Sequence, residues 1–519
     1  MNAPAAPQYD AIVIGAGHNG LAAAATLAGK GRSVCVIERA AEVGGMSKTV
    51  PLAPGVTAPQ IAHLLYNLDP RVAKELGLSG FASKPLPTVC LAEDGAHVVL
   101  GGGAARFADG TAHPEAAAHA ALVARLRRFA ALLGRLSRMS PPAAATDVNG
   151  LTDLASLARL GIDLKRLGKA EMREFLRILL SNVHDLLLDD FSDGPLAGAL
   201  AADAVRGAYA GPRSPGTVFS LMYRLGNGGE VRLPMGGMGA VAGAFEAAAR
   251  ARGCEIRTGC GVARILVEGD RACGLLLEDG SRLRAKTVLS SAGALATMQM
   301  AGAAHFDVEA VRRLRNLRAK GTTAKVNLAL SAAPEFPGLD AAQRAGRLLV
   351  APSSTYVERA FNPVKYGETS KAPVIEAVIP SLTDPGACEG GRHVLSAIVS
   401  YVPYAPKGGW TDSARDDLAA LTIATLETYA PGLGTLVTKA QVLTPADIET
   451  MTGAPQGHWH HAEMGIDQIL TLRPANGMAR YRFGPEGCYL CGASAHPGGD
   501  VMGAAGRNAA RQLLRDGGA

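Results

Sequence analysis

The sequence predicts an α/β chain built on a parallel sheet that carries a nucleotide-binding turn. Three observations lead to this prediction. A short apolar strand near the start of the chain runs directly into a glycine-rich turn and then a helix. The next strand ends in an acidic residue. A further strand, glycine-rich loop and helix close the chain, which suggests that both ends contribute to one site.

The first turn is Gly15-Ala16-Gly17-His18-Asn19-Gly20, between the apolar run 9–14 and an Ala/Leu-rich helix expected from Leu21 to about Gly29. Gly15 permits the tight turn, Gly17 lets backbone N–H groups approach a diphosphate, and Gly20 allows close packing of helix on strand. The strand 33–37 ends in Glu38, whose carboxylate suits the two hydroxyls of a ribose. A carboxylate here would repel a 2′-phosphate, so NADP is not expected.

A second glycine pair distinguishes FAD from NAD. Arg39 leads into Gly44-Gly45-Met46-Ser47. This doublet resembles the one that follows the acidic strand in FAD-binding proteins of the glutathione-reductase-like superfamily, where the backbone approaches the cofactor. The resemblance implies FAD, with contacts from Arg39, Gly44, Gly45, Met46 and Ser47, and we also assign Val262 to the cofactor site.

The carboxyl-terminal end supplies the other half of the expected site. A strand at 488–491 runs into the glycine-rich loop 492–499, and a helix is expected from about Val501 to Leu514. Amides at such a helix start can stabilise the negative charge of a reduced flavin. We therefore assign Gly492, Asp500, Val501 and Met502 to the cofactor site. The alternative is a terminal structural helix with a glycine-rich entry.

Several blocks together resemble one family. They are GAGHNGL at 15–21, PMGGMG at 234–239, IPSLTDP at 379–385 and HPGGDVMGAAGRNAA at 496–510. These blocks are similar to those of the phytoene desaturase-like branch of the amine oxidase/desaturase flavoproteins, and in particular to the group called pyridine nucleotide-disulfide oxidoreductase domain-containing protein 2. The resemblance covers nearly the whole chain.

This resemblance implies a Rossmann-type FAD-binding domain, a discontinuous α+β substrate domain and a helical cap. We expect the FAD-binding domain to take residues 1–70, 231–300 and 466–519. The substrate domain is expected to take 71–230 and 301–465, with the cap at about 110–225. A Pro/Ala-rich stretch at 141–147 predicts a flexible link within the cap.

Three residues are candidates for proton transfer. Lys325, in a predicted strand at 321–328, resembles the strand lysine that holds a water near flavin N5 in amine oxidases; the alternative is an exposed lysine at a strand end. Asp500 stands where the related group usually has glycine, and is either a general base or the N-cap of the last helix. By resemblance, His461 faces the substrate side of the flavin; the alternative is a structural histidine.

The chemistry expected is that of an FAD-dependent dehydrogenase or desaturase, in which an apolar small molecule loses a hydride from a C–C or C–N bond to flavin N5. A non-redox isomerase of the carotenoid isomerase type and a flavin-stabilised binding protein remain alternatives. Disulfide reductase chemistry is not expected, because residues 40–60 contain no cysteine and Cys488 and Cys491 would point to opposite faces of a strand. No metal site is expected, because the histidines at 458–461 have no further partner at ligand spacing.

Composition limits partners and location. A net charge of +6 with both signs interspersed does not indicate nucleic-acid binding. No secretory signal and no run of 18 apolar residues is evident, so we expect a cytoplasmic protein, either monomer or homodimer. The segment 115–138 predicts an amphipathic helix with a basic face. That helix either touches the inner membrane face peripherally or is a cap helix with a solvated surface.

Overall fold

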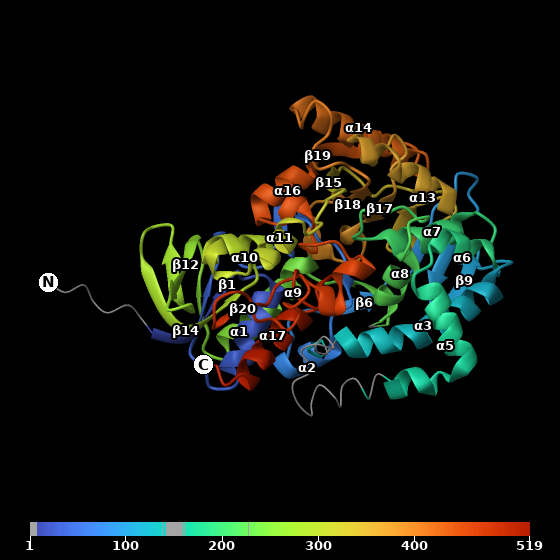
Figure 1. Cartoon of the computed structure of the whole chain (residues 1–519). Helices are drawn as coiled ribbons and strands as arrows, with labels where there is room; N and C mark the ends of the chain where they lie inside the picture. Colours follow the sequence, from blue (N-terminus) through green and yellow to red (C-terminus); the bar gives the residue numbers. More distant parts are fainter. Residues whose placement is uncertain (1–7, 138, 142–157, 159–160, 227, 519) are drawn as a thin grey trace.

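The computed structural model describes residues 8–137, 139–141, 158, 161–226 and 228–518 (Figure 1). Two large sheets, a helical region and two small sheets make up this part of the chain. Of the link predicted at 141–147, residues 142–147 lie outside the described residues.

The first large sheet has seven strands in the order β11-β2-β1-β14-β13-β12, with β20 beside β14. Its parallel members are β1 (Gln8–Ile14), β2 (Val34–Ile37), β11 (Glu255–Arg257), β14 (Arg282–Ser290) and β20 (Cys488–Leu490). The antiparallel strands β12 (Val262–Glu268) and β13 (Arg271–Leu277) form its edge. Residues 11–14 of β1, all of β2 and residues 288–289 of β14 are apolar and buried, because both faces of a parallel sheet are covered.

Helices from both ends and from the middle of the chain cover one face of this sheet. They are α1 (His18–Ala28), α9 (Gly237–Arg250) and α17 (Ala504–Arg515), which share one apolar core. Figure 1 shows α1 and α17, in blue and red, packed side by side. A Cβ added to Gly506 of α17 would lie 1.8 Å from the carbonyl oxygen of Asn19, so only glycine permits this close approach.

Two predicted helix boundaries are wrong. Helix α1 begins at His18 instead of Leu21, because Gly17 is already extended and serves as the N-cap. Helix α17 begins at Ala504 instead of Val501, because Gly503 adopts the left-handed conformation (φ 69°) immediately before it. Val501 and Met502 therefore belong to the loop that precedes the helix.

The second large sheet has eight strands in the order β19-β15-β18-β17-β16-β7-β8-β9. Their bounds are β7 (Thr88–Cys90), β8 (Val98–Gly101), β9 (Ala104–Phe107), β15 (Thr323–Leu330), β16 (Arg347–Val350), β17 (Ile375–Val378), β18 (His393–Ser400) and β19 (Val437–Leu443). Strand β15 confirms the strand predicted at 321–328. One face packs into an apolar core with α14 (Asp412–Glu427), and residues of the opposite face line the site described below.

The described residues also form two small sheets. One pairs β3 (Thr49–Ala53) with β4 (Val56–Pro59), and the other joins β5 (Leu65–Tyr66), β10 (Val231–Pro234) and β6 (Ser83–Pro85). Helices elsewhere in the described residues are α2 (Pro70–Leu76), α10 (Ala294–Ala301), α11 (Val308–Arg315), α12 (Ala341–Arg344), α15 (Leu433–Leu436) and α16 (Pro445–Thr452).

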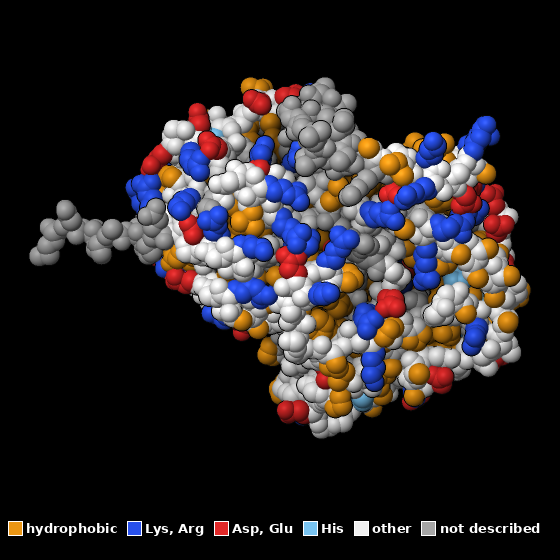
Figure 2. Space-filling model, turned by 90° about the horizontal axis from the view of Figure 1, so that it is seen from below, with side chains coloured by type: hydrophobic (Ala, Val, Ile, Leu, Met, Phe, Trp, Pro, Cys, Tyr) orange, Lys and Arg blue, Asp and Glu red, His pale blue; other side chains and the backbone are white. Residues whose placement is uncertain are grey.

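A helical region packs around a third apolar core. It contains α3 (Ala116–Ser137), α5 (Gly168–Leu179), α6 (Val183–Leu188), α7 (Pro195–Val205), α8 (Thr217–Leu225) and α13 (Ser354–Phe361). Helix α3 is amphipathic as predicted: Leu122, Leu126, Phe129 and Leu133 are buried, whereas its arginines 127, 128 and 135 are exposed. Figure 2 shows Lys and Arg side chains scattered among acidic and apolar ones. Among the described residues, no helix has both the length and the apolarity needed to cross a membrane.

Candidate functional site

A cavity of about 540 Å³ is lined by residues of both large sheets. Ile14 of β1 and Ile37 of β2 belong to its wall on the side of the first sheet, and Ile398 of β18 belongs to its wall on the side of the second. Its volume lies in the range of roughly 300–1,000 Å³ that is typical of ligand and cofactor sites. The cavity is therefore large enough to hold a small molecule.

Most residues assigned to a cofactor lie in this wall. The residues that line it are Gly15, Gly17, Glu38, Arg39, Gly45, Met46, Ser47, Val262, Gly492, Asp500 and Val501. Gly20, Gly44 and Met502 lie outside the wall. A Cβ on Gly20 would be 2.0 Å from the Gly15 carbonyl oxygen, so Gly20 brings helix and turn together. Gly44 has φ +116°, and Met502 is buried.

The start of α1 has the features of a diphosphate cradle. Gly17 is its N-cap, and a Cβ placed there would meet no atom within 4 Å, so the space before the helix is open. The backbone N–H groups and the dipole of a helix N-terminus attract anions. Glu38 accepts hydrogen bonds from the backbone N–H groups of Ala16 (2.7 Å) and Ala40 (2.9 Å), which hold its carboxylate at the cavity.

Ser291 ties three distant segments together at the cavity. Its hydroxyl donates to the carbonyl of Ile14 at 2.8 Å, and a Cβ on Gly15 would lie 2.4 Å from this hydroxyl oxygen. A Cβ on Gly492 would lie 2.5 Å from the Ser291 carbonyl oxygen. The first turn and the carboxyl-terminal loop therefore approach the same serine, and both require glycine to do so.

Asp500 is not the N-cap of the last helix, because Gly503 occupies that position. Its carboxylate forms an ion pair with Arg206 (2.9 Å to Nη1) and accepts a hydrogen bond from the Asn67 amide at 2.7 Å. Burial disfavours the charged form, but Arg206, His460 and Asn67 outweigh burial and lower the pKa of Asp500. Asp500 is therefore an ionised group in the cavity wall.

His461 also lines the cavity, in a left-handed backbone conformation (φ 58°). Its Nδ1 is buried and has no hydrogen-bond partner among the described residues. Burial lowers the pKa of His461 to about 4, so the ring is neutral near pH 7. A neutral ring with an unpartnered nitrogen can accept or pass on a proton.

Lys325 is 1% exposed, so the alternative of an exposed lysine at a strand end is wrong. It does not itself line the cavity. In the sheet register it is paired with Ile398, which is paired in turn with Glu376, so these three side chains share one face of the sheet. Its Nζ has no hydrogen-bond partner among the described residues, and burial places the pKa of Lys325 well below its usual value.

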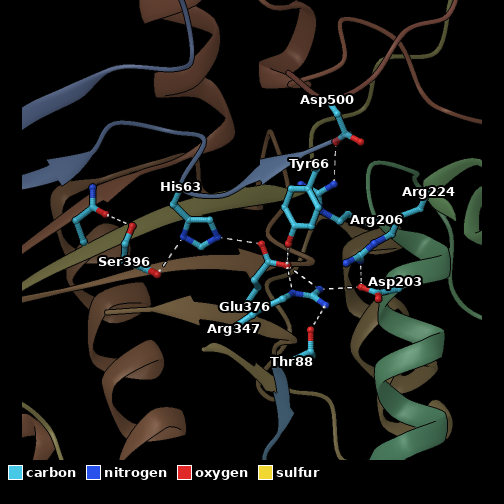
Figure 3. Close-up of polar contacts among 11 residues, drawn as sticks. His63, Tyr66, Thr88, Asp203, Arg206, Arg224, Arg347, Glu376, Ser396 and Asp500 are labelled. Carbon is cyan, nitrogen blue, oxygen red and sulfur yellow. Dashed lines mark hydrogen bonds and ion pairs between the residues drawn. The ribbon is translucent and has the colours of Figure 1, made fainter. Parts of the chain in front are cut away.

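A set of buried and half-buried charged and polar side chains lies in and beside the cavity wall. Figure 3 shows the contacts among these side chains. We call this set the polar network; its members are His63, Tyr66, Asp203, Arg206, Arg224, Arg347, Glu376 and Asp500. Glu376 accepts hydrogen bonds from the Tyr66 hydroxyl (2.8 Å) and from Arg347 Nε (2.7 Å). Arg347 also pairs with Asp203 at 2.7 Å. The Arg206 guanidinium lies 3.8 Å from the centre of the Tyr66 ring, which favours a cation–π contact.

Of this network, only Asp500 was predicted from the sequence. One signal was available: Glu376 is a single acid within the apolar run Val374–Val378, where an unpaired carboxylate would be costly. Its partners come from elsewhere in the chain, and His63 is 313 residues away. No spacing in the sequence pointed to them.

The fold and the cavity define a class of protein. A strand–glycine turn–helix unit, an acidic strand end and a carboxyl-terminal glycine loop meet at one cavity, as in flavin-dependent oxidoreductases. A family model described as flavin containing amine oxidoreductase matches residues 20–514. The chain belongs to this family.

Individual relatives agree with this assignment. The chain is 32% identical over 545 residues to the "Pyridine nucleotide-disulfide oxidoreductase domain-containing protein 2" of Mus musculus, covering 98% of this chain and 94% of that protein. It is 26% identical over 527 residues to the "Phytoene desaturase (neurosporene-forming)" of Rhodobacter capsulatus, covering 95% and 91%. A structure of putrescine oxidase bound to putrescine shares the fold, with TM-score 0.61, 16% identity and coverage of 98% and 99%.

These findings confirm the predicted family, fold class and enzyme class, and FAD as the cofactor. The cradle at α1, the open space at Gly17 and the loop at Gly492 fit that cofactor. Among the described residues, no group of three His, Cys, Asp or Glu side chains could hold a metal ion.

Anaerobic titration with dithionite is expected to consume two electrons per bound FAD, with none taken up by cysteines. Cys488 and Cys491 are free thiols buried in two different apolar cores. Burial raises the pKa of Cys488 to about 12 and raises that of Cys491 as well, so neither forms the thiolate that disulfide exchange needs. Uptake of four electrons per FAD would reveal a redox-active cysteine pair.

Proposed function

We propose that this chain is an FAD-dependent dehydrogenase or desaturase that oxidises a C–C or C–N bond of a small molecule. The observation that supports this is the single cavity lined both by the dinucleotide motifs and by the second sheet. Bound FAD supplies the acceptor for a hydride at N5. The protein binds and orients the substrate, excludes water and provides groups that hold or move a proton.

Cofactor binding is proposed for the residues assigned from the sequence. Gly15 and Gly17 would hold the diphosphate, and Glu38 would accept from the ribose hydroxyls, with Arg39, Gly45, Met46, Ser47 and Val262 in the same wall. Gly492 and Val501 would approach the flavin ring. Gly20, Gly44 and Met502 would shape these loops without lining the cavity.

The cavity wall also supports a narrower proposal for the substrate. Apolar side chains such as Ile398 and Met300 share the wall with Tyr66, Trp459 and the Arg206–Asp500 ion pair. The apolar side chains suit an apolar body, and the charged and aromatic side chains can contact a polar group of the substrate. We therefore favour a substrate with an apolar body and at least one polar group.

Proton transfer is proposed for Lys325 and His461. Both are buried, and each has a nitrogen without a hydrogen-bond partner among the described residues. Burial holds the pKa of Lys325 well below its usual value and lowers that of His461 to about 4. Asp500 is a weaker candidate, because a carboxylate with a lowered pKa has little tendency to take up a proton. Its contacts favour a role in holding Arg206 in place.

The test is anaerobic mixing of FAD-loaded protein with a panel of amines, cyclic ketones, fatty acyl compounds and isoprenoids. The expected result is that one class bleaches the flavin absorbance and yields a product two mass units lighter. A product of unchanged mass would indicate an isomerase, and FAD that resists both the panel and dithionite would indicate a binding protein. A colourless protein that cannot be loaded with FAD would contradict the proposal.

We propose that the FAD-binding domain takes residues 1–70, 231–300 and 466–519. The substrate domain would then take residues 71–230 and 301–465. We also propose a cytoplasmic location, with the basic face of α3 as the surface that would touch a membrane.

A further inference from the structure

His63 lies in the cavity wall with both ring nitrogens facing hydrogen-bond acceptors. Nδ1 is 3.1 Å from the carbonyl oxygen of Ser396, and Nε2 is 2.9 Å from Oε1 of Glu376. A carbonyl oxygen only accepts, so Nδ1 carries a hydrogen. A neutral ring has a single N–H, and its Nε2 lone pair would then face a carboxylate oxygen. The contact therefore requires one further proton on the His63–Glu376 pair.

The surroundings of Glu376 place this proton on the histidine. The other carboxylate oxygen, Oε2, accepts hydrogen bonds from the Tyr66 hydroxyl and from Arg347 (Figure 3). Burial opposes the charge, but Arg347, His63 and Arg206 outweigh it and hold the pKa of Glu376 well below its usual range. Burial lowers the pKa of His63, and a charged Lys325 or Arg206 lowers it further, whereas the hydrogen bond to the Glu376 carboxylate raises it and favours the imidazolium. Only the imidazolium satisfies both contacts.

A second buried histidine shows the arrangement that a neutral ring adopts. Nδ1 of His97 accepts a hydrogen bond from the backbone N–H of Ala92 at 3.0 Å. Its Nε2 lies 3.0 Å from the carbonyl oxygen of Pro337 and donates to it. One donor and one acceptor match a neutral imidazole, and His63 departs from this pattern because it faces two acceptors.

The protonation state of the Lys325 amine depends on the charge of His63. Lys325 shares a face of the second sheet with Ile398 and Glu376, and its amine lacks a hydrogen-bond partner among the described residues. Glu376 acts on the Lys325 amine, His63 is coupled to that amine electrostatically, and Arg206, the residue after α7, acts on His63. Burial disfavours the ammonium form, Glu376 favours it, and an adjacent imidazolium opposes it.

We propose that the His63–Glu376 ion pair is a positioning device whose imidazolium offsets the Glu376 carboxylate and so keeps the Lys325 amine neutral and able to accept a proton. The pair itself does not exchange protons with a substrate, because both N–H groups of His63 are already engaged. The consequence for catalysis rests on the proposed function. The protonation states do not, so they can be measured without a substrate.

The experiment is NMR titration of FAD-loaded protein labelled with ¹⁵N-histidine and ¹³Cε-lysine. The signals are assigned from spectra of His63→Gln and Lys325→Arg. In the wild type, both ring nitrogens of His63 are expected to stay protonated from pH 6 to 8, while the Lys325 signal stays at the position of a neutral amine. An unprotonated nitrogen in His63 over this range would overturn the proposal by itself, without any variant.

Two variants distinguish the effect of the His63 charge on Lys325 from the effect of the Glu376 charge. His63→Gln removes the cation and leaves Glu376, so the Lys325 titration midpoint should rise by about 1 pH unit or more. Glu376→Gln supplies an amide that donates to Nε2, the ring becomes neutral, and both charges disappear, so the midpoint should change little. His97→Gln is the matched control and should cause no shift.

The opposite pattern would contradict the proposal. If His63 is neutral, His63→Gln leaves the Lys325 midpoint unchanged, and Glu376→Gln lowers it because the only charge on the pair is lost. The two proposals can fail separately. If no substrate reduces the flavin but His63 is an imidazolium, only the oxidoreductase proposal is refuted. Reduction by substrate together with a neutral His63 refutes the positioning device alone.

Discussion

Gly20→Ala is expected to give protein that retains FAD at least about tenfold less tightly than the wild type and unfolds at lower denaturant concentration. The added methyl group would lie 2.0 Å from the Gly15 carbonyl oxygen and 3.2 Å from Ser291 Oγ. Gly15 belongs to the first turn, and Ser291 is hydrogen-bonded to the end of β1. The steric clash can therefore be removed only if α1 moves away from β1. Overpacking of this kind costs about 1–3 kcal/mol, and 1.4 kcal/mol corresponds to a tenfold change in affinity.

The measurements are FAD release followed by fluorescence and denaturant unfolding of the loaded protein. Gly243→Ala in α9 is the matched control, because a Cβ there meets no atom within 4 Å. Alanine in a helix interior should raise the free energy of unfolding by about 0.5–1 kcal/mol and leave FAD affinity unchanged. Wild-type FAD retention in Gly20→Ala would show that the helix–turn contact does not set the cofactor site.

Arg347→Met is expected to lower the free energy of unfolding by about 3–5 kcal/mol, because removing one partner leaves buried charges uncompensated. Arg347 is 2% exposed and contacts Glu376 and Asp203, each at 2.7 Å. Arg312→Met removes an exposed pair with Glu309, so the free energy of unfolding should change little. Equal losses in the two variants would mean that the polar network does not stabilise the fold.

The same substitution should change the dependence of stability on pH. The folded-state pKa of Glu376 lies well below its unfolded value, so its contribution is fully present above the unfolded pKa of about 4.3. That contribution is lost as the pH falls toward the folded pKa. In Arg347→Met the pKa of Glu376 rises, so urea unfolding at pH 7 and pH 4 should differ less than in the wild type.

Most of the residues assigned to the cofactor line the cavity, and they could be found in the sequence because their motifs are contiguous. Gly15, Gly17 and Gly20 act within one strand–turn–helix unit, and Glu38 ends the next strand, so local geometry determines what each contributes. The carboxyl-terminal loop could be recognised for the same reason. The helix starts at His18 and Ala504 were missed because glycine caps, which depend on backbone conformation, decide where these helices begin.

The family, the cofactor and a turn that suits a diphosphate could all be predicted from short contiguous motifs. Three features became evident only in the folded chain: Lys325 is buried, Asp500 pairs with Arg206, and His63 contacts Glu376, which is 313 residues away. A short motif carries its own backbone geometry, whereas a buried charge is tolerated only where strand register and packing bring its partners within hydrogen-bond distance.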